Sequence, residues 1–256
     1  MMKKKNLGKA IGVVLIIAMV CMFWQLIDYL PVIGDPQSPP NTHVSKVYIV
    51  EGPSMTHSPN LVTGVLADFR GFDTLWETTV MLLAGMAVSM ILSNKLRRHW
   101  DASIFGEIRS FGGPDVKAMI PLIVPFILLY AVYVLMHGEV SLGGGFQAGA
   151  LVALGYILYA MVAGIKISKI KVTQHLAITM ASVGVMIYAL TGVLPMLNGG
   201  KFLEYAKLPF GAETTAHLHG TGILMIEIGV TVCVAATIIT ILEAVLERKS
   251  LYDGSK

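Results

Sequence analysis

Six apolar stretches dominate this chain of 256 residues, and each is long enough to cross a lipid bilayer. They run near residues 11–30, 74–93, 118–136, 146–165, 172–197 and 219–246. About 20 apolar residues are needed to span the hydrocarbon core as a helix. The backbone must then satisfy its own hydrogen bonds, because lipid offers none. We therefore predict an all-α polytopic membrane protein with six transmembrane helices.

The composition supports the same fold class. Only 14% of the residues are charged and 55% are hydrophobic, whereas about a quarter of the residues in a soluble domain are charged. The two cysteines, Cys21 and Cys233, both fall in apolar stretches, and their spacing matches neither a disulfide framework nor a metal site. The chain also contains no Walker loop, Rossmann fingerprint or HExxH motif. We therefore expect no catalytic residues, no metal ligands and no cofactor.

The basic residues predict the orientation of the helices. With the N-terminus inside the cell, 15 of the 19 lysines and arginines fall in inner segments, as the positive-inside rule requires. Both termini are then cytoplasmic, and one long outer loop joins the first two helices of a multi-pass protein in the cell (plasma) membrane. The first apolar stretch has the charge and length of a signal peptide. We expect it to remain as a helix, because no small-x-small cleavage site follows it.

Three segments follow from this arrangement. They are a two-span module with the outer loop at residues 1–98, a cytoplasmic connector at 99–116 and a four-span module at 117–256. Within the outer loop, a proline-rich linker precedes an alternating stretch at 43–50 that favours a strand. The apolar spacing over Leu61–Phe69 then predicts an amphipathic helix at the outer surface, which Gly71 ends.

Four ionisable side chains crowd the outer end of the second span: Asp68, Arg70, Asp73 and Glu77. Thr74 and Glu77 match a capping box, with Asp73 as an alternative cap. Arg70 is expected to pair with Asp68 or Asp73 and to lock the turn. Glu77 lies one turn inside the span, where charge is expensive. It is either a proton-binding or cation-binding group, or the partner of the helix cap.

A glycine-rich loop joins the third and fourth spans. It contains three consecutive glycines, Gly143, Gly144 and Gly145, which permit unusual dihedral angles and close backbone approach. The four-residue spacing from Gly145 to Gly149 continues as a stripe of small residues, which predicts tight helix packing. His137 and Glu139 in the same loop are either ion-path groups or surface polar residues.

The last span carries Glu227, with no lysine or arginine within helical reach. An isolated carboxyl group inside a span is a functional candidate by default. His217 and His219 lie at the outer end of the same helix, either as proton carriers or as an interfacial cap. At the inner end, Glu243 is followed by further charged residues, which predicts an ordinary solvated helix end.

Two groups of motifs carry a family resemblance. The run from Asn60 through Asp68-Phe69-Arg70-Gly71-Phe72-Asp73-Thr74 to Glu77 resembles the C-terminal end of the large subunit of Mrp-type Na⁺/H⁺ antiporters, and the small E subunit of membrane-bound, gas-evolving hydrogenases. From Lys117 onward, the chain resembles the antiporter B subunit of the MnhB family. The motifs there are His137-Gly138, Gly143-Gly144-Gly145-Phe146, Pro209-Phe210-Gly211 and Met225-Ile226-Glu227-Ile228-Gly229-Val230.

The resemblance implies an accessory membrane subunit of a multisubunit Mrp-type sodium/proton antiporter, with Glu77 and Glu227 helping to form an ion path. The implied partners are other membrane subunits of an Mrp-type or complex-I-like assembly, without nucleic acid. Two alternatives stay open. One is the same subunit, without a catalytic role, in a redox-driven complex such as a membrane-bound hydrogenase or a ferredoxin-dependent complex. The other is a purely structural scaffold.

The sequence departs from the family pattern in three ways. Trp76 replaces a small residue, and Glu227 replaces the more usual aspartate. The long antiporter core, with its interior lysines, is absent. The chain alone is therefore expected neither to transport ions nor to act as an enzyme.

Overall fold

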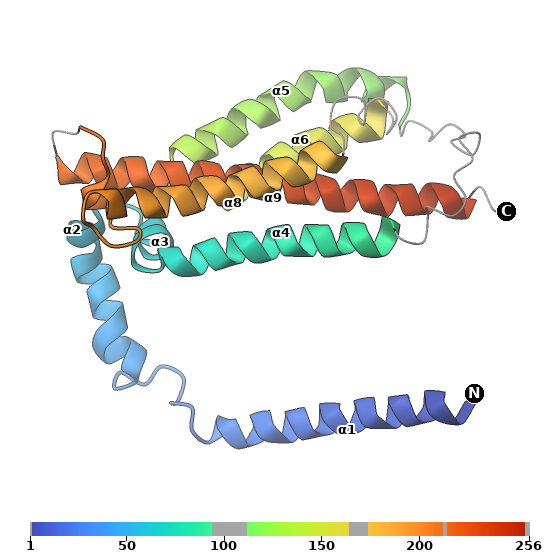
Figure 1. Cartoon of the computed structure of the whole chain (residues 1–256), viewed down its shortest axis with the longest axis horizontal. Helices are drawn as coiled ribbons and strands as arrows, with labels where there is room; N and C mark the ends of the chain where they lie inside the picture. The colour runs from blue at the N-terminus through green and yellow to red at the C-terminus, as the bar shows by residue number, and fades with distance from the viewer. Residues whose placement is uncertain (1, 94–111, 164–173, 212–213, 254–256) are drawn as a thin grey trace. The chain divides into compact units, whose positions relative to one another are not determined.

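The structure, a computed structural model, describes residues 2–93, 112–163, 174–211 and 214–253. Helices dominate these residues, and no strand occurs among them (Figure 1). The chain divides into two compact units, one ending at Val47 and the other beginning at Tyr48. The predicted all-α class is therefore confirmed for the described part of the chain.

The first unit consists of helix α1 (Met2–Ile27), a series of turns and the short π-helical segment η1 (Pro40–Val44). The apolar part of α1, Ile11–Ile27, is shorter than the other candidate spans. Almost all its side chains from Ile11 onward are exposed within the chain. An exposed, wholly apolar helix is stable in lipid and not in water.

The second unit contains the remaining long helices. They are α4 (Gly71–Ser93), α5 (Pro114–Met136), α6 (Gly145–Ala163), α8 (Gln174–Leu197) and α9 (Thr215–Asp253). Each of these five carries a segment long and apolar enough to cross a bilayer, and no other described helix does. They coincide within a few residues with five of the six predicted spans. The chain is therefore a multi-pass membrane protein.

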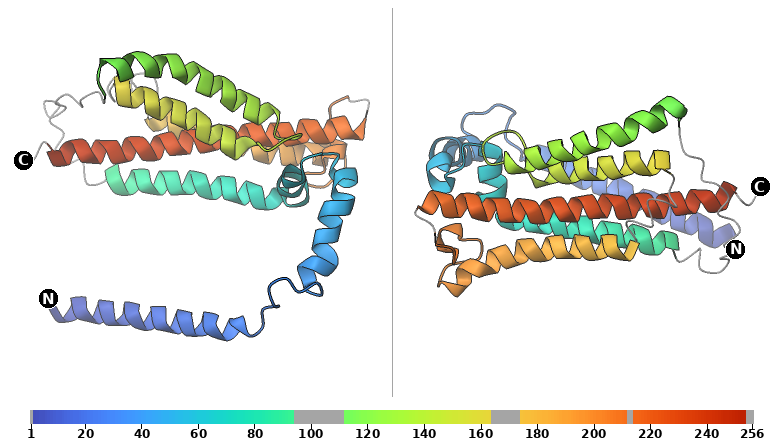
Figure 2. Two further views of the ribbon diagram at one scale, coloured as in Figure 1. Left: turned by 180° about the vertical axis from the view of Figure 1, so that it is seen from behind. Right: turned by 90° about the horizontal axis from the view of Figure 1, so that it is seen from above.

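Helix α9 is the central helix of this unit. It packs against α8, α6 and α4, while α5 packs mainly on α6. Figure 2 shows α9 running between α6 and α8 along the length of the unit. Ile223, Ile226, Val230 and Val234 recur at helical spacing on one buried face of α9 and form the core with Tyr188. Glu227 lies among these residues and is buried with them.

Glycines allow the helices around α9 to approach to backbone distance. A Cβ atom at Gly184 of α8 would lie 2.5 Å from the carbonyl oxygen of Gly229 on α9. On the other side, a Cβ atom at Gly149 of α6 would lie 2.9 Å from the carbonyl oxygen of Thr231. Gly145 makes a similar contact with the Glu227 carbonyl. Gly145 and Gly149 of the small-residue stripe thus lie directly against the backbone of α9.

The outer segment before α4 corrects one expectation. The predicted strand at 43–50 is wrong, because that stretch forms η1 and the π-helical segment η2 (Val47–Glu51). A strand is stable only when neighbouring strands satisfy its backbone, and the described residues offer none. Helix α2 (Gly52–Thr56) follows directly.

The predicted helix over Leu61–Phe69 is confirmed as two short segments, α3 (Leu61–Thr63) and η3 (Gly64–Phe69). Its buried residues are the small ones, Thr63, Gly64 and Ala67, whereas Leu61 and Leu66 are exposed. The helix ends at Arg70, whose φ is −121°. Gly71 is the first residue of α4 and does not end the preceding helix, contrary to the prediction.

Part of the predicted organisation lies outside the described residues. This holds for most of the connector at 99–116 and for eight of the basic residues, namely Lys95, Arg97, Arg98, Arg109, Lys166, Lys169, Lys171 and Lys256. The division into segments 1–98, 99–116 and 117–256 stays a prediction, as does the cytoplasmic position of both termini.

The contact between Gly184 and Gly229 generates a stability prediction. Gly184→Ala should lower the free energy of unfolding by about 1–3 kcal/mol, the usual cost of overpacking a close contact. The new methyl group meets backbone atoms, which cannot rotate away. Gly12→Ala in α1 is the control, because no atom lies within 4 Å of its Cβ position. Thermal unfolding in detergent measures both variants, and equal midpoints would contradict the packing argument.

Candidate functional site

Glu227 is the central residue of the candidate site. It lies on the buried face of α9, and only 8% of the residue is exposed. No described residue donates a hydrogen bond to its carboxylate or forms an ion pair with it. A buried carboxyl group normally has such partners. Its isolation singles out Glu227 among the sequence candidates.

The turn between α5 and α6 lies against the Glu227 carboxylate. A Cβ atom at Gly138 would lie 2.8 Å from Oε2 and 2.9 Å from Oε1 of Glu227. At Gly144, whose φ is +136°, a Cβ atom would lie 3.1 Å from Oε1. Gly144 thus has the unusual dihedral predicted for the triple glycine. Gly143 packs on the Val134 carbonyl oxygen, with 2.6 Å between that atom and a Cβ position.

Glu139 comes from the same turn and adds a second acidic group. It is partly buried, and its negative charge acts on Glu227. Both of its carboxylate oxygens lie 2.9 Å from the Cβ position of Gly220 on α9. Glu139 therefore reaches α9 about two helical turns before Glu227. The structure brings these two sequence candidates together.

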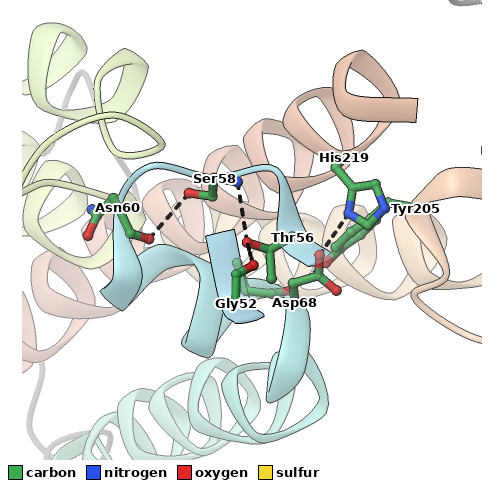
Figure 3. Close-up of polar contacts among 8 residues, drawn as sticks. Gly52, Thr56, Ser58, Asn60, Asp68, Tyr205 and His219 are labelled. Atoms are coloured by element: carbon green, nitrogen blue, oxygen red, sulfur yellow. Dashed lines mark hydrogen bonds and ion pairs between the residues drawn. The ribbon is translucent and has the colours of Figure 1, made fainter. Parts of the chain in front are cut away.

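An aspartate–histidine pair lies near the start of α9. His219 Nδ1 is 2.7 Å from Asp68 Oδ2, and the two side chains are 14% and 21% exposed. Figure 3 shows this contact with Tyr205 beside the histidine ring. His57 presents its ring edge-on to His219 at a centroid distance of 5.3 Å. Asp68 and His219 were both sequence candidates, but the sequence did not pair them.

Tyr205 lies near both the Asp68–His219 pair and Glu227. It begins the short 3₁₀ segment η5 (Tyr205–Lys207), is fully buried and donates a hydrogen bond of 2.7 Å to the Ala67 carbonyl. Burial raises the pKa of the Tyr205 phenol well above its usual value, and the charges of Asp68 and Glu227 add to this effect. The hydroxyl group therefore stays protonated. Its ring packs against Gly222, between His219 and Glu227 on α9.

Tyr188 of α8 holds the beginning of α4 in place. Its buried hydroxyl donates a hydrogen bond of 2.6 Å to the Gly71 carbonyl. A Cβ atom at Gly71 would lie 3.2 Å from Leu203 Cδ1 and 3.6 Å from the Tyr188 hydroxyl oxygen. Gly71 is therefore required for close packing. Sequence reasoning missed both tyrosines, since tyrosine is ordinary in apolar spans and only long-range contacts reveal these roles.

The structure corrects the interpretation of the outer end of α4. Asp73 and Thr74 lie inside the first turn of a helix that begins at Gly71, so the predicted cap and capping box are wrong. Thr74 Oγ1 donates instead to the Leu66 carbonyl at 2.8 Å. Arg70 pairs with Asp73, with Nε 2.6 Å from Oδ2. This hydrogen bond, and then the charge of Asp73, raise the pKa of the Arg70 guanidinium.

Three other candidates lie apart from this cluster of contacts. Glu77 is exposed and forms no hydrogen bond or ion pair with the described residues. His137 is also exposed, and its ring stacks on Tyr133 at a centroid distance of 4.1 Å. His217 is exposed at the start of α9.

The inner end of α9 also differs from expectation. Glu243 is only 3% exposed, and its Oε1 accepts a hydrogen bond of 2.7 Å from the Tyr156 hydroxyl of α6. The predicted solvated end is therefore wrong at this residue. Glu243 follows the buried residues Thr237, Ile239 and Thr240, so the buried part of α9 continues to this residue.

Two family models match this chain in succession. A domain related to the MnhB subunit of the Na⁺/H⁺ antiporter matches residues 116–240, which include Glu139, His219 and Glu227. The MbhE family, described as the E subunit of MBH, matches residues 10–104, which include Asp68. The candidate site therefore contains residues from both matched parts.

Two solved structures share this fold. One is the membrane-bound sulfane sulfur reductase, an archaeal respiratory membrane complex, with a TM-score of 0.67 and 23% identity over 92% of this chain and 97% of that chain. The other is the Mrp complex from Dietzia sp. DQ12-45-1b, with a TM-score of 0.59 and 24% identity over 93% of this chain and 26% of that chain. At these identities the likeness is one of fold.

Two relatives that match this chain in sequence are described as antiporter subunits. The A/B subunit of a probable K⁺/H⁺ antiporter of Rhizobium meliloti (strain 1021) is 28% identical over 201 residues, or 68% of this chain. The chain spans only 20% of the length of that relative. The putative antiporter subunit mnhB2 of Staphylococcus haemolyticus (strain JCSC1435) is 32% identical over 132 residues, which are 50% of this chain and 91% of the relative. The chain therefore belongs to the MnhB family of Na⁺/H⁺ antiporter subunits, with an N-terminal part of the MbhE type joined to it.

Proposed function

We propose that this chain is an accessory membrane subunit of a multisubunit, Mrp-type cation/proton antiporter, and that Glu227 lies on the ion path. The observation that carries the proposal is the buried Glu227 carboxylate without a partner among the described residues. A carboxyl group in such a place is costly to ionise alone. It is suited to bind and release a proton or a cation.

The neighbouring groups give the proposed path a direction. Asp68 and His219 form a partly exposed pair at one end, and a histidine exchanges protons near neutral pH. Glu139 reaches α9 at Gly220, next to His219, and the Tyr205 ring packs on Gly222, between His219 and Glu227 in the sequence of α9. A proton or cation entering at the pair would meet oxygen atoms along this route. Partner subunits complete the path, since this chain on its own is not proposed to transport ions or to catalyse a reaction.

The remaining sequence candidates belong to the surface of the protein in this proposal. Glu77 lies on an exposed face of α4 beside Trp76 and Val80. A charged group facing lipid is expensive, so we place this face against another membrane subunit. In this proposal, Asp73, His137 and His217 are polar groups at the outer surface and take no part in the ion path. The proposed topology has six spans, both termini in the cytoplasm and the 28–70 segment outside the cell membrane.

A second candidate is the same subunit in a redox-driven ion-pumping complex. Two findings favour it: the match of residues 10–104 to the MbhE family, and the 97% coverage of a chain from an archaeal respiratory complex. In that setting the chain would be a non-catalytic subunit of a membrane oxidoreductase, with hydrogenase or ferredoxin-linked partners. The proposed role of Glu227 is the same in both assemblies.

Replacing Glu227 tests the proposed ion path. In the whole complex, Glu227→Gln should reduce ion-coupled transport at least about tenfold, because the amide cannot exchange a proton. Assembly should be unchanged, since glutamine keeps the size of the side chain and removes a buried charge. Transport is measured in proteoliposomes with a pH-sensitive dye. Glu51→Gln, at an exposed glutamate, is the matched control. Full transport by Glu227→Gln would leave only a scaffold role.

The Asp68–His219 pair allows a double-mutant test. Asp68→Asn and His219→Gln should each slow transport, and the double variant should be no slower than the slower single variant. Residues that act as one unit give such non-additive effects. Initial rates in proteoliposomes measure all three. Strictly multiplicative losses would show that the two side chains act separately.

Purification distinguishes the two kinds of assembly. The tagged chain, isolated from its native membrane in mild detergent, should retain antiporter-type membrane subunits, which mass spectrometry identifies. Iron–sulfur or nickel proteins in the same preparation would instead support the redox-driven complex. Recovery of the chain without any other membrane subunit would contradict both.

A further inference from the structure

A segment far from Glu227 in the sequence holds the turn that lies against it. Asn60 Nδ2 is 2.8 Å from the Gly138 carbonyl oxygen and 2.6 Å from that of Ser141. Thr63 Oγ1 donates a hydrogen bond of 2.6 Å to the same Gly138 oxygen. Ser58 Oγ donates to the Glu139 carbonyl at 3.0 Å. Three polar side chains of one short segment thus bind three carbonyl groups of one turn.

These contacts are buried and connect distant parts of the chain. Ser58, Asn60 and Thr63 are between 2% and 9% exposed. The Asn60–Gly138 bond joins residues 78 positions apart. Within the segment, Asn60 Nδ2 also lies 3.0 Å from Thr63 Oγ1, and its Oδ1 accepts the Val62 amide at 3.1 Å. Figure 3 shows Ser58 and Asn60 on the same stretch of backbone. Such a buried network has a single favourable arrangement.

The network decides which atoms of the turn face Glu227. The Gly138 carbonyl oxygen accepts two hydrogen bonds from the 58–63 segment. The Cβ direction of Gly138 points at the Glu227 carboxylate. Glycine has the freedom to rotate its peptide group, and such a rotation would change which atoms of the turn face the carboxylate. The hydrogen bonds from Asn60 and Thr63 to the Gly138 oxygen oppose it.

We propose that Asn60 and Thr63 are positioning residues for the Glu227 site: they hold the Gly138–Ser141 turn closed over the carboxyl group and so limit the access of water and ions to it. The proposal rests on the ion-path role of Glu227. The residues that hold the turn lie in the part that matches the MbhE family, and the turn lies in the MnhB-related part. The site is incomplete without both parts.

Chemical labelling measures this access directly. The whole complex in detergent is treated with a water-soluble carbodiimide and glycine methyl ester, and mass spectrometry quantifies the amide formed on Glu227. Thr63→Val keeps the side-chain shape but removes the hydroxyl donor, whereas Thr63→Ser keeps it. Loss of one neutral hydrogen bond shifts an opening equilibrium by about fivefold. Labelling of Glu227 should therefore rise about fivefold in Thr63→Val and stay near the wild-type rate in Thr63→Ser.

Asn60→Ala should raise the labelling further, because both the Gly138 and Ser141 carbonyls lose a donor. Asn198→Ala is its control, since Asn198 is exposed and its side chain bonds only the Lys207 carbonyl among the described residues. Labelling of the exposed Glu51 should be equal in every variant. If Asn60→Ala does not assemble, the comparison of Thr63→Val with Thr63→Ser tests the inference without it, because valine has nearly the shape of threonine and preserves the packing.

Equal Glu227 labelling in Thr63→Val and Thr63→Ser would overturn the inference. That failure is separate from a failure of the proposed function. If Glu227→Gln abolishes transport while the labelling is equal, the ion path stands and the positioning role falls. If Glu227→Gln transports normally, the ion path falls, whatever the labelling shows.

Discussion

Backbone-distance packing around α9 is the constraint on which the rest of the structure depends. Gly184 of α8 and Gly149 of α6 meet the α9 backbone from two sides. In lipid, where apolar side chains gain little by leaving the solvent, such close contacts are a main source of helix association. Further along α9, Gly138 and Gly144 of the turn between α5 and α6 meet the Glu227 carboxylate in the same way, since a Cβ atom at either would lie within 3.1 Å of its oxygens. The burial of Glu227, and hence its chemistry, follows from this packing.

The same constraint explains why much of the fold was predictable and part of the site was not. Five spans follow from apolar length alone, and the Gly145–Gly149 stripe follows from small-residue spacing. The partner of His219 is Asp68, 151 residues away, and no local pattern encodes that distance. The strand predicted at 43–50 failed because alternation is a weak signal in a short segment without a neighbouring strand. The prediction that Glu243 is solvated failed because it was based on the charged residues that follow in the sequence, whereas Glu243 itself is buried.

Joining the two matched parts in one chain has a physical consequence for the site. The 58–63 segment and the Gly138 turn make several hydrogen bonds, each worth only about 1 kcal/mol net. Between separate chains, such bonds must also offset the loss of translational and rotational freedom. Within one chain the effective concentration of the two partners is high. Their contact then persists at any expression level of the protein.

The distribution of charge over the spans accounts for the need for partners. The sequence has no lysine or arginine in residues 71–92, 118–136, 145–163, 174–197 or 215–245, whereas Glu77 and Glu227 lie within these ranges. An acidic group in lipid needs a proton, a cation or a basic side chain to balance it. No described residue supplies a basic partner to Glu227. In the proposed ion path, a mobile proton or cation, or a basic group on a neighbouring subunit, provides this balance.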